Sequence, residues 1–593
     1  MSLTRRSPCG SLRAAQVGET VDLYGWVHRR RDHGGLIFID LRDRSGLVQV
    51  TFAPANAEPY AAAGSLRLEY VLRVTGVVRR RPSGAENRDL LTGEIEVEAA
   101  SVEILSRAKT PPFAINEDSQ VDEQLRLRYR YLDLRRPSMA RHLHLRHRMV
   151  KAVRDFLDRE GFTEIETPVM IRSTPEGARD YLVPSRLRAG YFYALAQSPQ
   201  LYKQLLMVAG LDRYFQIARC YRDEDLRADR QPEFTQLDLE MSFVSEDDVL
   251  DVIGRCFGHV WEKVLESRIQ VPIRRITHAE AIAKYGLDKP DLRYGLEITD
   301  LTEIFSKTGF KIFRQVIDQG GCVRGIRVPG GAGIAGKEID ALTEVARAEG
   351  AKGLAWWQRT GDGWQSPIAK FFTPVEHDAL QAGTGAQAGD LVVAVADRPD
   401  IAAPALGQVR RDAARRLGLI AAGATEFVWV TDFPLFERSK ETGHVTPAHH
   451  PFTSPNPEDL ALLEKEPLRV RARAYDLVLN GTELGSGSIR IHDAAMQQRV
   501  FQGIGLTPDE AQRRFGFLLE AFEYGAPPHG GFAFGVDRVV MLAAAEESIR
   551  EVIAFPKNQQ AEEPMTGAPA PIDPSQLREL GLEIRRRTET RPS

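Results

Sequence analysis

Charged residues in a predicted hairpin could bind phosphate groups. The run that begins at Arg213 and the run that begins at Gln231 both have the composition of β-strands, and a charged loop joins them. This hairpin would present Arg222 and Glu224 at the base of its loop. A guanidinium binds phosphate through paired hydrogen bonds, and a nearby carboxylate can bind an adenine amino group or a magnesium ion. The alternative for the hairpin is a solvated surface loop.

A second candidate lies near the C-terminal end, where glycines interrupt a strand-like run. The residues from Gly530 to Gly535 are followed by Arg538 and by an apolar helix predicted over 536–545. Glycine weakens a strand and usually marks the close approach of another group. A flat adenine on this strand, with Arg538 near its phosphates, would explain the glycines; a glycine bulge in a core strand is the alternative. A third segment, 161–168, predicts a short edge strand that a proline ends.

Two other motifs lack the context that their chemistry requires. The segment from Gly331 to Lys337 matches the GxGxxG pattern of dinucleotide-binding turns and nearly matches a P-loop. A P-loop needs Ser or Thr directly after the lysine, but Glu338 stands there. A dinucleotide-binding turn needs an uninterrupted strand before it, and Pro329 argues against such a strand. We therefore expect a loop that caps the following helix. The Gly485–Ser488 segment lacks the second glycine of a nucleophile elbow, because Ile489 stands there.

Size and composition limit the classes of protein to which the chain can belong. Its 593 residues suffice for about three or four domains. The longest apolar run, Val539–Ala545, is too short to cross a bilayer, and the N-terminus lacks the apolar core of a signal peptide, so we expect no membrane partner. Four cysteines without a CxxC pair predict neither a zinc site nor disulfides, which favours a cytoplasmic protein.

The net charge of −4 gives no global sign of nucleic-acid binding, so any RNA contact would use local basic patches. Residues 121–160 form such a patch, because they hold eleven Lys or Arg against six Asp or Glu. The alternative is a solvated helix face with internal ion pairs.

Several predicted elements would position the candidate residues. Residues 106–119 predict a linker, and apolar residues at helical spacing predict a helix over 141–160. Residues 290–418 have weaker motifs and several glycine-rich loops, which indicates an inserted or separate domain. Five short β-rich runs suit a small barrel of the OB type: 21–27, 35–41, 47–52, 70–78 and 94–98.

Three segments, in this order, resemble the signature motifs of the class II aminoacyl-tRNA synthetases: 161–168, 213–240 and 530–538. Four more are similar to segments of the bacterial aspartyl-tRNA synthetases: 173–181, 197–203, 449–455 and 475–490. The resemblance covers nearly the whole chain. It implies an α+β multidomain fold with an N-terminal OB-fold β-barrel, a catalytic domain built on an antiparallel sheet, and an inserted α+β domain.

The same resemblance divides the chain into six parts and implies a homodimer, with segment 161–168 near the subunit interface. The parts are an anticodon-binding barrel (1–105), a hinge (106–140), the first part of the catalytic domain (141–289), the bacterial insertion (290–418), the second part of the catalytic domain (419–560) and a C-terminal extension (561–593).

The activity implied is that of an aspartate–tRNA ligase. The α-carboxylate of aspartate would attack the α-phosphate of ATP, with Arg222 and Arg538 as catalytic residues that stabilise charge, and the tRNA would then take the aspartyl group. The side chain of aspartate needs cations, which Lys203 and Arg490 supply while Asp238 balances their charge. The resemblance assigns to aspartate Glu176, Gln200, Lys203, Arg222, Asp238, His449 and Arg490. It assigns to ATP Arg222, Asp223, Glu224, Gln231, Glu483, Gly535, Val536, Asp537 and Arg538, and to Mg²⁺ Glu483.

The resemblance also places the tRNA anticodon on the barrel. Phe38 is the candidate stacking platform, with a core residue as the alternative, and Arg31 and Gln49 are candidate base or phosphate contacts. Some members of the family charge only tRNA-Asp, and others also charge tRNA-Asn. The relaxed group tends to have histidine and glycine where this chain has His33 and Gly84. We therefore expect both tRNAs as partners, with a strictly discriminating enzyme as the alternative.

Three other classes were weighed. A sister synthetase for asparagine or lysine is disfavoured by the large insertion and by the aspartate-type segments. A non-enzymatic RNA-binding relative would be expected to lose Arg222 or Arg538, and both are present. A P-loop ATPase would depend on Lys337, so mutation of that residue discriminates it.

Overall fold

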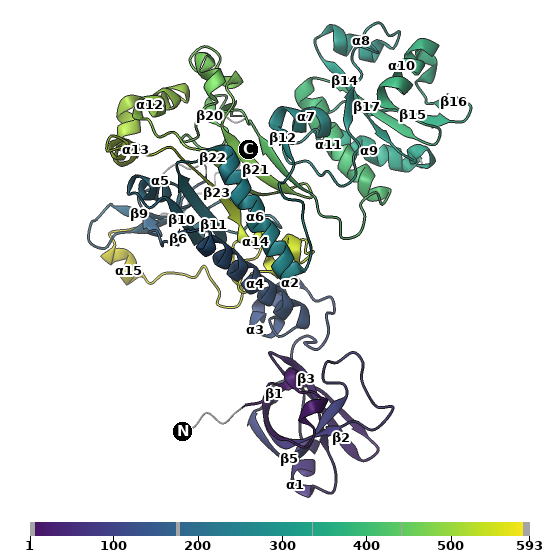
Figure 1. Cartoon of the computed structure of the whole chain (residues 1–593), viewed down its shortest axis with the longest axis vertical. Helices are drawn as coiled ribbons and strands as arrows, with labels where there is room; N and C mark the ends of the chain where they lie inside the picture. Colours follow the sequence, from purple (N-terminus) through teal and green to yellow (C-terminus); the bar gives the residue numbers. More distant parts are fainter. Residues whose placement is uncertain (1–5, 174–177, 335, 440–441, 585–593) are drawn as a thin grey trace. The chain divides into compact units, whose positions relative to one another are not determined.

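The computed structural model describes residues 6–173, 178–334, 336–439 and 442–584 (Figure 1). The chain divides into two compact units. One unit contains the N-terminal residues through Leu143 together with 554–558 and 562–569, and the other contains the rest of the chain.

The first unit contains a closed five-stranded barrel with the strand order β1-β2-β3-β5-β4. Side chains such as Val21, Leu23 and Val27 are buried inside it, and the residues between them face outward, because alternate residues of a strand point to opposite faces. The barrel predicted from the sequence is confirmed. Its elements are β1 (Thr20–His33), β2 (Leu36–Asp43), β3 (Gly46–Phe52), β4 (Val71–Arg80), β5 (Ile95–Ser106) and, between β3 and β4, helix α1 (Ala57–Gly64).

Part of the basic patch after the barrel is internal to the protein. Asp133, in the short helix α3 (Arg130–Asp133), is fully buried and forms ion pairs with Arg126 of α2 (Glu123–Arg128), with Arg130 and with Arg136. These arginines stabilise the fold, as the alternative of internal ion pairs predicts.

The second unit is built on an eight-stranded sheet in the order β12-β18-β21-β22-β23-β11-β10-β6. All neighbours are antiparallel except the two edge pairs, β12 with β18 and β10 with β6. The predicted antiparallel sheet is confirmed, and the predicted hairpin is β10–β11. The bounds are β6 (Thr163–Glu164), β10 (Arg213–Tyr221), β11 (Glu233–Ser242), β12 (Arg275–Thr277), β18 (Phe427–Thr431), β21 (Ala474–Leu479), β22 (Thr482–Ile489) and β23 (His529–Gly535).

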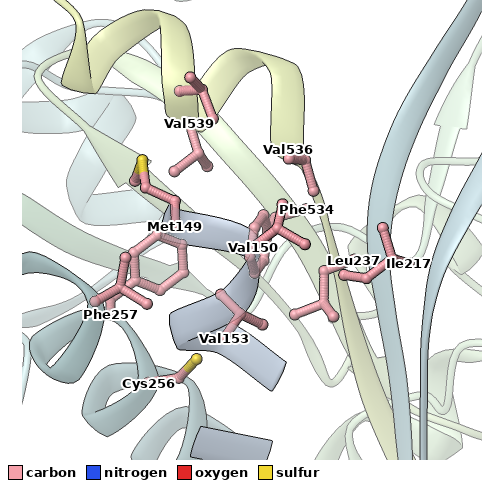
Figure 2. Close-up of a pocket in the computed structure, with 12 residues that line it drawn as sticks. Met149, Val150, Val153, Ile217, Leu237, Cys256, Phe257, Phe534, Val536 and Val539 are labelled. Carbon is pink, nitrogen blue, oxygen red and sulfur yellow. The ribbon is translucent and has the colours of Figure 1, made fainter. Parts of the chain in front are cut away.

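Helices α4 (Pro137–Arg159), α6 (Glu246–Leu265) and α14 (Val536–Ala543) share one apolar core with this sheet. The predicted helix over 141–160 is α4. This core contains a cavity of about 20 Å³, and Figure 2 shows the apolar side chains and Cys256 that line it. A cavity without polar partners does not bind water well, so we expect this one to be dry.

Residues 290–418 fold around a separate antiparallel sheet in the order β13-β14-β17-β15-β16. The strands are β13 (Ile298–Asp300), β14 (Cys322–Val328), β15 (Ala355–Thr360), β16 (Gly363–Gln365) and β17 (Leu391–Asp397). The helices are α8 (Lys311–Asp318), α9 (Gly336–Ala348), α10 (Pro374–Thr384) and α11 (Pro399–Arg416).

The GxGxxG segment follows strand β14 of this inserted domain, so the expectation that Pro329 interrupts the strand before it is wrong. An uninterrupted strand, β14, does precede the segment, because it ends at Val328 just before Pro329. The sheet is antiparallel, however, whereas a dinucleotide-binding turn belongs to a parallel βαβ unit. The segment is therefore not such a site.

The remaining elements lie in the second unit. A three-stranded sheet, β7-β9-β8, contains β7 (Met170–Ile171), β8 (Leu182–Pro184) and β9 (Phe192–Leu195), and a two-stranded sheet contains β19 (Phe436–Arg438) and β20 (Val445–Pro447). The other helices are α5 (Gln200–Val208), α7 (His278–Tyr285), α12 (Ala494–Gly503), α13 (Pro508–Phe522) and α15 (Pro574–Glu579). Within the ranges that the structure describes, no helix is long and apolar enough to cross a membrane.

Candidate active site

A cavity of about 450 Å³ lies over strands β11, β22 and β23 of the large sheet. The loop between β10 and β11 and the start of α14 add charged side chains to its lining. The sheet therefore brings together segments that are about 300 residues apart in the sequence. The predicted site residues that line the cavity are Gln200, Lys203, Arg222, Glu224, Gln231, Asp238, His449, Glu483, Arg490, Gly535, Asp537 and Arg538.

Two cations and two carboxylates form a buried cluster at this cavity: Lys203, Arg490, Asp238 and Glu240. None of the four is more than 2% exposed. Lys203 Nζ lies 3.1 Å from Asp238 Oδ2 and 3.2 Å from Glu240 Oε2, and Arg490 Nε donates to Glu240 Oε1 at 2.9 Å. An unbalanced charge at this depth would cost several kcal/mol, so the equal number of opposite charges is what allows the cluster to be buried.

The pKa values of the two acids of the cluster are shifted in opposite directions. Burial raises the pKa of Asp238 to about 6, although Lys203 opposes the shift. Burial would also raise the pKa of Glu240, but Arg490 and Lys203 outweigh it and hold that pKa below its ordinary value. Asp238 Oδ1 is buried and has no hydrogen-bond partner among the residues described. A buried oxygen in this state usually marks the place of a ligand or a water molecule.

Two arginines of the cavity have donors that the described part of the chain does not use. The Arg222 guanidinium lies 5.2 Å from the ring centroid of Phe234, and its Nε is buried without a partner there. Arg538 donates through Nη1 to the Glu483 carbonyl at 2.7 Å and through Nη2 to Asp229 at 3.2 Å, and its Nε is also buried without a partner. Free guanidinium donors beside an aromatic ring suit a nucleotide, whose phosphates accept hydrogen bonds and whose base stacks.

Two further carboxylates, Glu483 and Asp476, influence each other. Burial, and then the charge of Asp476, raise the pKa of Glu483. His449 Nε2 lies 3.3 Å from Asp476 Oδ1. Burial lowers the pKa of His449, but the hydrogen bond to Asp476 and the charges of the nearby acids outweigh burial, so the pKa of His449 is raised overall. A Mg²⁺ ion would relieve the repulsion between the acids, and proteins commonly bind Mg²⁺ through one or two carboxylates plus substrate phosphates. The residues therefore fit the ion. No group of three or more metal-ligating side chains occurs among the described residues, so substrate oxygens would have to complete its coordination.

The glycines of β23 have a different cause from the one expected. Gly531 pairs with Glu240 across the sheet, and a Cβ at Gly531 would collide with the Glu240 carboxylate. Gly531 is therefore required by a side chain of the protein and not by a bound adenine. Gly535 lines the cavity and has space for a Cβ, so its lack of a side chain leaves the cavity open there.

Other predicted ATP residues are placed away from the cavity or are already engaged. The Asp223 carboxylate does not line the cavity and lies 3.5 Å from Arg179 instead. Val536 points into the apolar core and lines the small cavity of Figure 2, because the apolar side of α14 faces that core. Asp537 lines the large cavity, but its Oδ1 accepts from an arginine of α4 at 2.5 Å and its Oδ2 from a backbone amide at 2.8 Å. Glu176 lies outside the described residues.

Among the residues that sequence reasoning did not single out, Phe234 and His450 line the cavity, and Glu240 and Asp476 contact residues that line it. Phe234 and Glu240 lie on the same face of β11 as Asp238, because alternate residues of a strand share a face, so counting by two from Asp238 would have found them. His450 Nε2 lies 2.6 Å from Arg490 Nη1, whereas His449, predicted for aspartate, lies beside Asp476.

The barrel carries the predicted anticodon residues on its outer side. Phe38 is half-buried while both of its neighbours point inward, so its ring is not a core residue. Arg31 Nη2 donates to Asp40 at 2.8 Å and to Gln49 at 3.2 Å, and Gln49 donates to Glu96 at 2.7 Å. An exposed aromatic face beside hydrogen-bonded polar groups suits the stacking of single-stranded bases.

The two residues predicted to set tRNA specificity lie at loops of the barrel. His33 is exposed at the end of β1, where the turn to β2 begins. Gly84 lies between β4 and β5 with a φ of 85°, a conformation that favours glycine.

Two family models match the chain. A model described as tRNA synthetases class II (D, K and N) matches residues 122–559, and one described as an OB-fold nucleic acid binding domain matches residues 21–105. The first contains the large sheet and the whole cavity lining. The protein is therefore an aminoacyl-tRNA synthetase of class II.

Full-length relatives narrow this class. The chain is 56% identical over 591 residues to the aspartate–tRNA(Asp/Asn) ligase of Moorella thermoacetica, which covers 100% of this chain and 98% of that protein. It is 55% identical over 583 residues to the aspartate–tRNA(Asp/Asn) ligase of Heliobacterium modesticaldum, covering 98% and 96%. The chain belongs to the family of aspartate–tRNA ligases.

Solved structures agree on the fold. The asparaginyl-tRNA synthetase from Pyrococcus horikoshii, complexed with asparaginyl-adenylate, superposes with a TM-score of 0.59 at 18% identity, covering 93% of this chain and 98% of that one. A putative aspartyl-tRNA synthetase from Leishmania major gives a TM-score of 0.59 at 19% identity, covering 94% and 96%. At such low identity these structures support the fold alone.

Proposed function

We propose that the large cavity activates aspartate with ATP and that the enzyme transfers the aspartyl group to both tRNA-Asp and tRNA-Asn. The observation that carries the site assignment is that Lys203, Asp238 and Arg490, which form a buried cluster with Glu240, line one cavity with two arginines that have unused donors. The cluster offers cations to a side-chain carboxylate, and the arginines offer donors to phosphates.

The reaction has two steps, and no protein atom forms a covalent bond in either. In the first step, an α-carboxylate oxygen of aspartate bonds to the α-phosphorus of ATP, the bond from that phosphorus to its bridging oxygen breaks, and pyrophosphate leaves. In the second step, a hydroxyl of the terminal ribose of the tRNA attacks the aspartyl carbonyl, AMP leaves, and the hydroxyl proton passes to solvent. Arg222 and Arg538 stabilise the charge on the phosphate oxygens, so catalysis consists of positioning and electrostatics.

The nucleotide lies at Arg222, Phe234 and Arg538 in this proposal. The Phe234 ring gives the adenine a surface on which to stack, and the free Nε donors of the arginines point to phosphate binding. Glu483 and Asp476 would hold Mg²⁺, which supplies positive charge that neutralises the phosphates. A magnesium titration tests this: in Glu483→Gln, the Mg²⁺ concentration for half-maximal activity should rise, and an unchanged value would contradict the assignment.

Selection of aspartate follows from the charges of the cluster. A substrate carboxylate can accept from both Lys203 and Arg490, whereas the amide of asparagine would bring its NH₂ group against a cation. ATP–pyrophosphate exchange with aspartate, asparagine and lysine tests this directly. We expect exchange with aspartate at least a hundredfold above the other two, since buried polar mismatches give large discrimination. Comparable exchange with asparagine or lysine would refute the proposal.

Charging of tRNA-Asn is supported by His33 and Gly84 at exposed positions of the barrel and by relatives whose names include both tRNAs. His33→Leu should reduce charging of tRNA-Asn while charging of tRNA-Asp by the same variant serves as its control. Equal charging of tRNA-Asn by the variant and the natural protein would count against a role for His33.

The enzyme is proposed to act as a homodimer in the cytoplasm. Large apolar side chains are exposed on and around the small sheet β7-β9-β8, next to segment 161–168: Val169, Met170, Leu182, Leu187, Tyr191, Phe192 and Tyr193. A patch of this kind commonly marks a protein interface. The four cysteines all lie in described, buried positions and none of them forms a disulfide, which suits a reducing compartment. Light scattering of Met170→Glu should show monomers where the natural protein gives dimers; a monomeric natural protein would refute the assignment.

A further inference from the structure

We infer that Arg410, in the inserted domain, positions the carboxylates of the nucleotide site, so that the insertion holds the ATP-binding part of the cavity in its working geometry. The inference rests on the proposed assignment of Glu483 and Asp476 to Mg²⁺ and ATP. It gives the insertion a role in the reaction through contacts that reach the large sheet along two routes.

Arg410 is a buried arginine whose donors are used on main-chain carbonyls. It lies on α11, is 2% exposed, and its guanidinium is between two rings, 4.8 Å from the Tyr285 centroid and 4.5 Å from that of Tyr294. Its Nη2 donates to the carbonyls of Asp291 at 2.5 Å and Gly295 at 2.6 Å. A guanidinium in this position fixes the path of the segment around it, because each donor requires its carbonyl in one place.

That segment, 286–297, connects α7 to the first strand of the inserted domain and touches the large sheet. Asp291 packs against Gly481, in the turn between β21 and β22; a Cβ on Gly481 would lie 3.0 Å from the Asp291 Cβ. The two strands joined by this turn carry Asp476 and Glu483. A shift of Asp291 would therefore move the turn that sets the spacing of the two carboxylates.

A second route runs through helix α7. Tyr285, under the Arg410 guanidinium, is the last residue of α7, and His278 is the first. The His278 ring lies 4.9 Å from Phe433, and the Phe433 ring lies 4.8 Å from His449, the histidine paired with Asp476. Arg410 thus contacts Asp291 on the first route and Tyr285 on the second, and the residues of the two routes do not include Lys203 or Asp238.

This separation distinguishes a positioning role from a purely structural one. If Arg410 only stabilises the protein, its loss should lower the active fraction and affect ATP and aspartate alike. If it positions Glu483 and Asp476, the KM for ATP and the Mg²⁺ requirement should change while the KM for aspartate does not.

The test is ATP–pyrophosphate exchange by full-length variants. Arg410→Met removes the donors, Arg410→Lys keeps the charge with fewer donors, and Arg411→Met, at the exposed neighbour on α11, is the matched control. We expect the KM for ATP and the Mg²⁺ concentration at half-maximal rate to rise roughly tenfold in Arg410→Met, as for other supporting residues around metal sites, with the KM for aspartate within about twofold. If near-UV circular dichroism shows that Arg410→Met does not fold, Arg410→Lys replaces it in the test. We expect the same changes in that variant, with a smaller rise in the KM for ATP and in the Mg²⁺ requirement.

A variant on the other side of the contact gives an independent check. In Gly481→Ala the new Cβ would push against Asp291, and the φ of 79° at this position disfavours alanine. The variant should therefore reproduce the ATP-specific effect of Arg410→Met. The effects of Gly481→Ala and Arg410→Lys should be less than additive when the two are combined. Unchanged constants in the Arg410 variants, or equal changes for ATP and aspartate, would overturn the inference. Glu483→Gln separates this failure from failure of the proposed site: if Glu483→Gln also leaves the ATP and Mg²⁺ dependence unchanged, the site assignment itself is wrong.

Discussion

Replacing Lys203 with methionine should weaken aspartate activation far more than it weakens ATP binding. The substitution keeps the length of the side chain but removes the ammonium that lies 3.1 Å from Asp238 Oδ2 and 3.2 Å from Glu240 Oε2. The cluster would then hold two carboxylates and one cation, Arg490, before the substrate adds a third carboxylate. Truncation of one partner in a buried, hydrogen-bonded charge contact with a bound molecule costs about 2–5 kcal/mol of binding free energy. That range corresponds to a loss on the order of thirty- to several-thousand-fold in kcat/KM for aspartate.

The lower end of this range is expected, because Asp238 can take up a proton once Lys203 is absent. The assay is ATP–pyrophosphate exchange with aspartate varied at saturating ATP, and the KM for ATP, which should stay within about twofold, is the internal reference. Lys151→Met is the matched control, since Lys151 is an exposed lysine of α4 paired with Asp155. A folded Lys203→Met protein whose kcat/KM for aspartate falls by less than about threefold would refute the assignment of the cluster to the substrate side chain.

Four more predictions follow from particular contacts. A bound aspartate adds negative charge to the neutral cluster, so a proton on Asp238, whose pKa burial raises to about 6, should assist binding. The KM for aspartate should therefore rise as the pH increases above about 6, and Asp238→Asn should flatten that profile. Because of the same raised pKa, Asp238 keeps its proton in the folded state between about pH 4 and 6, where the unfolded state has lost it. The contribution of Asp238 to the unfolding free energy should therefore fall as the pH rises from about 4 to about 6. Urea unfolding of the natural protein and of Asp238→Asn across this range measures the fall, and parallel pH profiles would contradict the prediction. Val153→Ile adds one methylene at the cavity of about 20 Å³ in Figure 2 and should raise the unfolding free energy by about 0.8 kcal/mol, while a decrease would show that the site is already full. Asp229→Asn removes the partly exposed carboxylate that pairs with Arg538 at 3.2 Å. The KM for ATP should rise by at most about fivefold, because exposed ion pairs are weak, and the KM for aspartate should not change. An equal change in both KM values would argue against a role of Asp229 at the nucleotide.

Much of the fold could be predicted from local patterns. Short β-rich runs predicted the strands of the barrel, and in the structure alternate residues of these strands are buried, because the period of a strand is two residues. Helical spacing of apolar residues predicted α4, and the charged loop between two β-rich runs predicted the hairpin that presents Arg222. Four predicted residues of this hairpin, Arg222, Glu224, Gln231 and Asp238, line the cavity, whereas Asp223 does not.

The remainder depends on contacts between distant segments, which no local pattern contains. Glu240 belongs to the buried cluster because Arg490, 250 residues later, reaches it across the sheet. Val536 was predicted for ATP from its motif, but the helix that starts there turns it into the core. The same holds for Arg410, which no local pattern singles out: the carbonyls to which it donates, at 291–296, are more than a hundred residues earlier.

The most direct test of this account is to charge purified tRNA-Asp and tRNA-Asn transcripts with labelled aspartate and, in parallel, with labelled asparagine. The account predicts that aspartate is attached to both transcripts in an ATP-dependent reaction and that asparagine is attached to neither. Charging of tRNA-Asp alone would limit the enzyme to one tRNA and remove the role of His33 and Gly84. Attachment of asparagine, or no attachment of aspartate to tRNA-Asp, would contradict the central claim that the buried cluster selects aspartate.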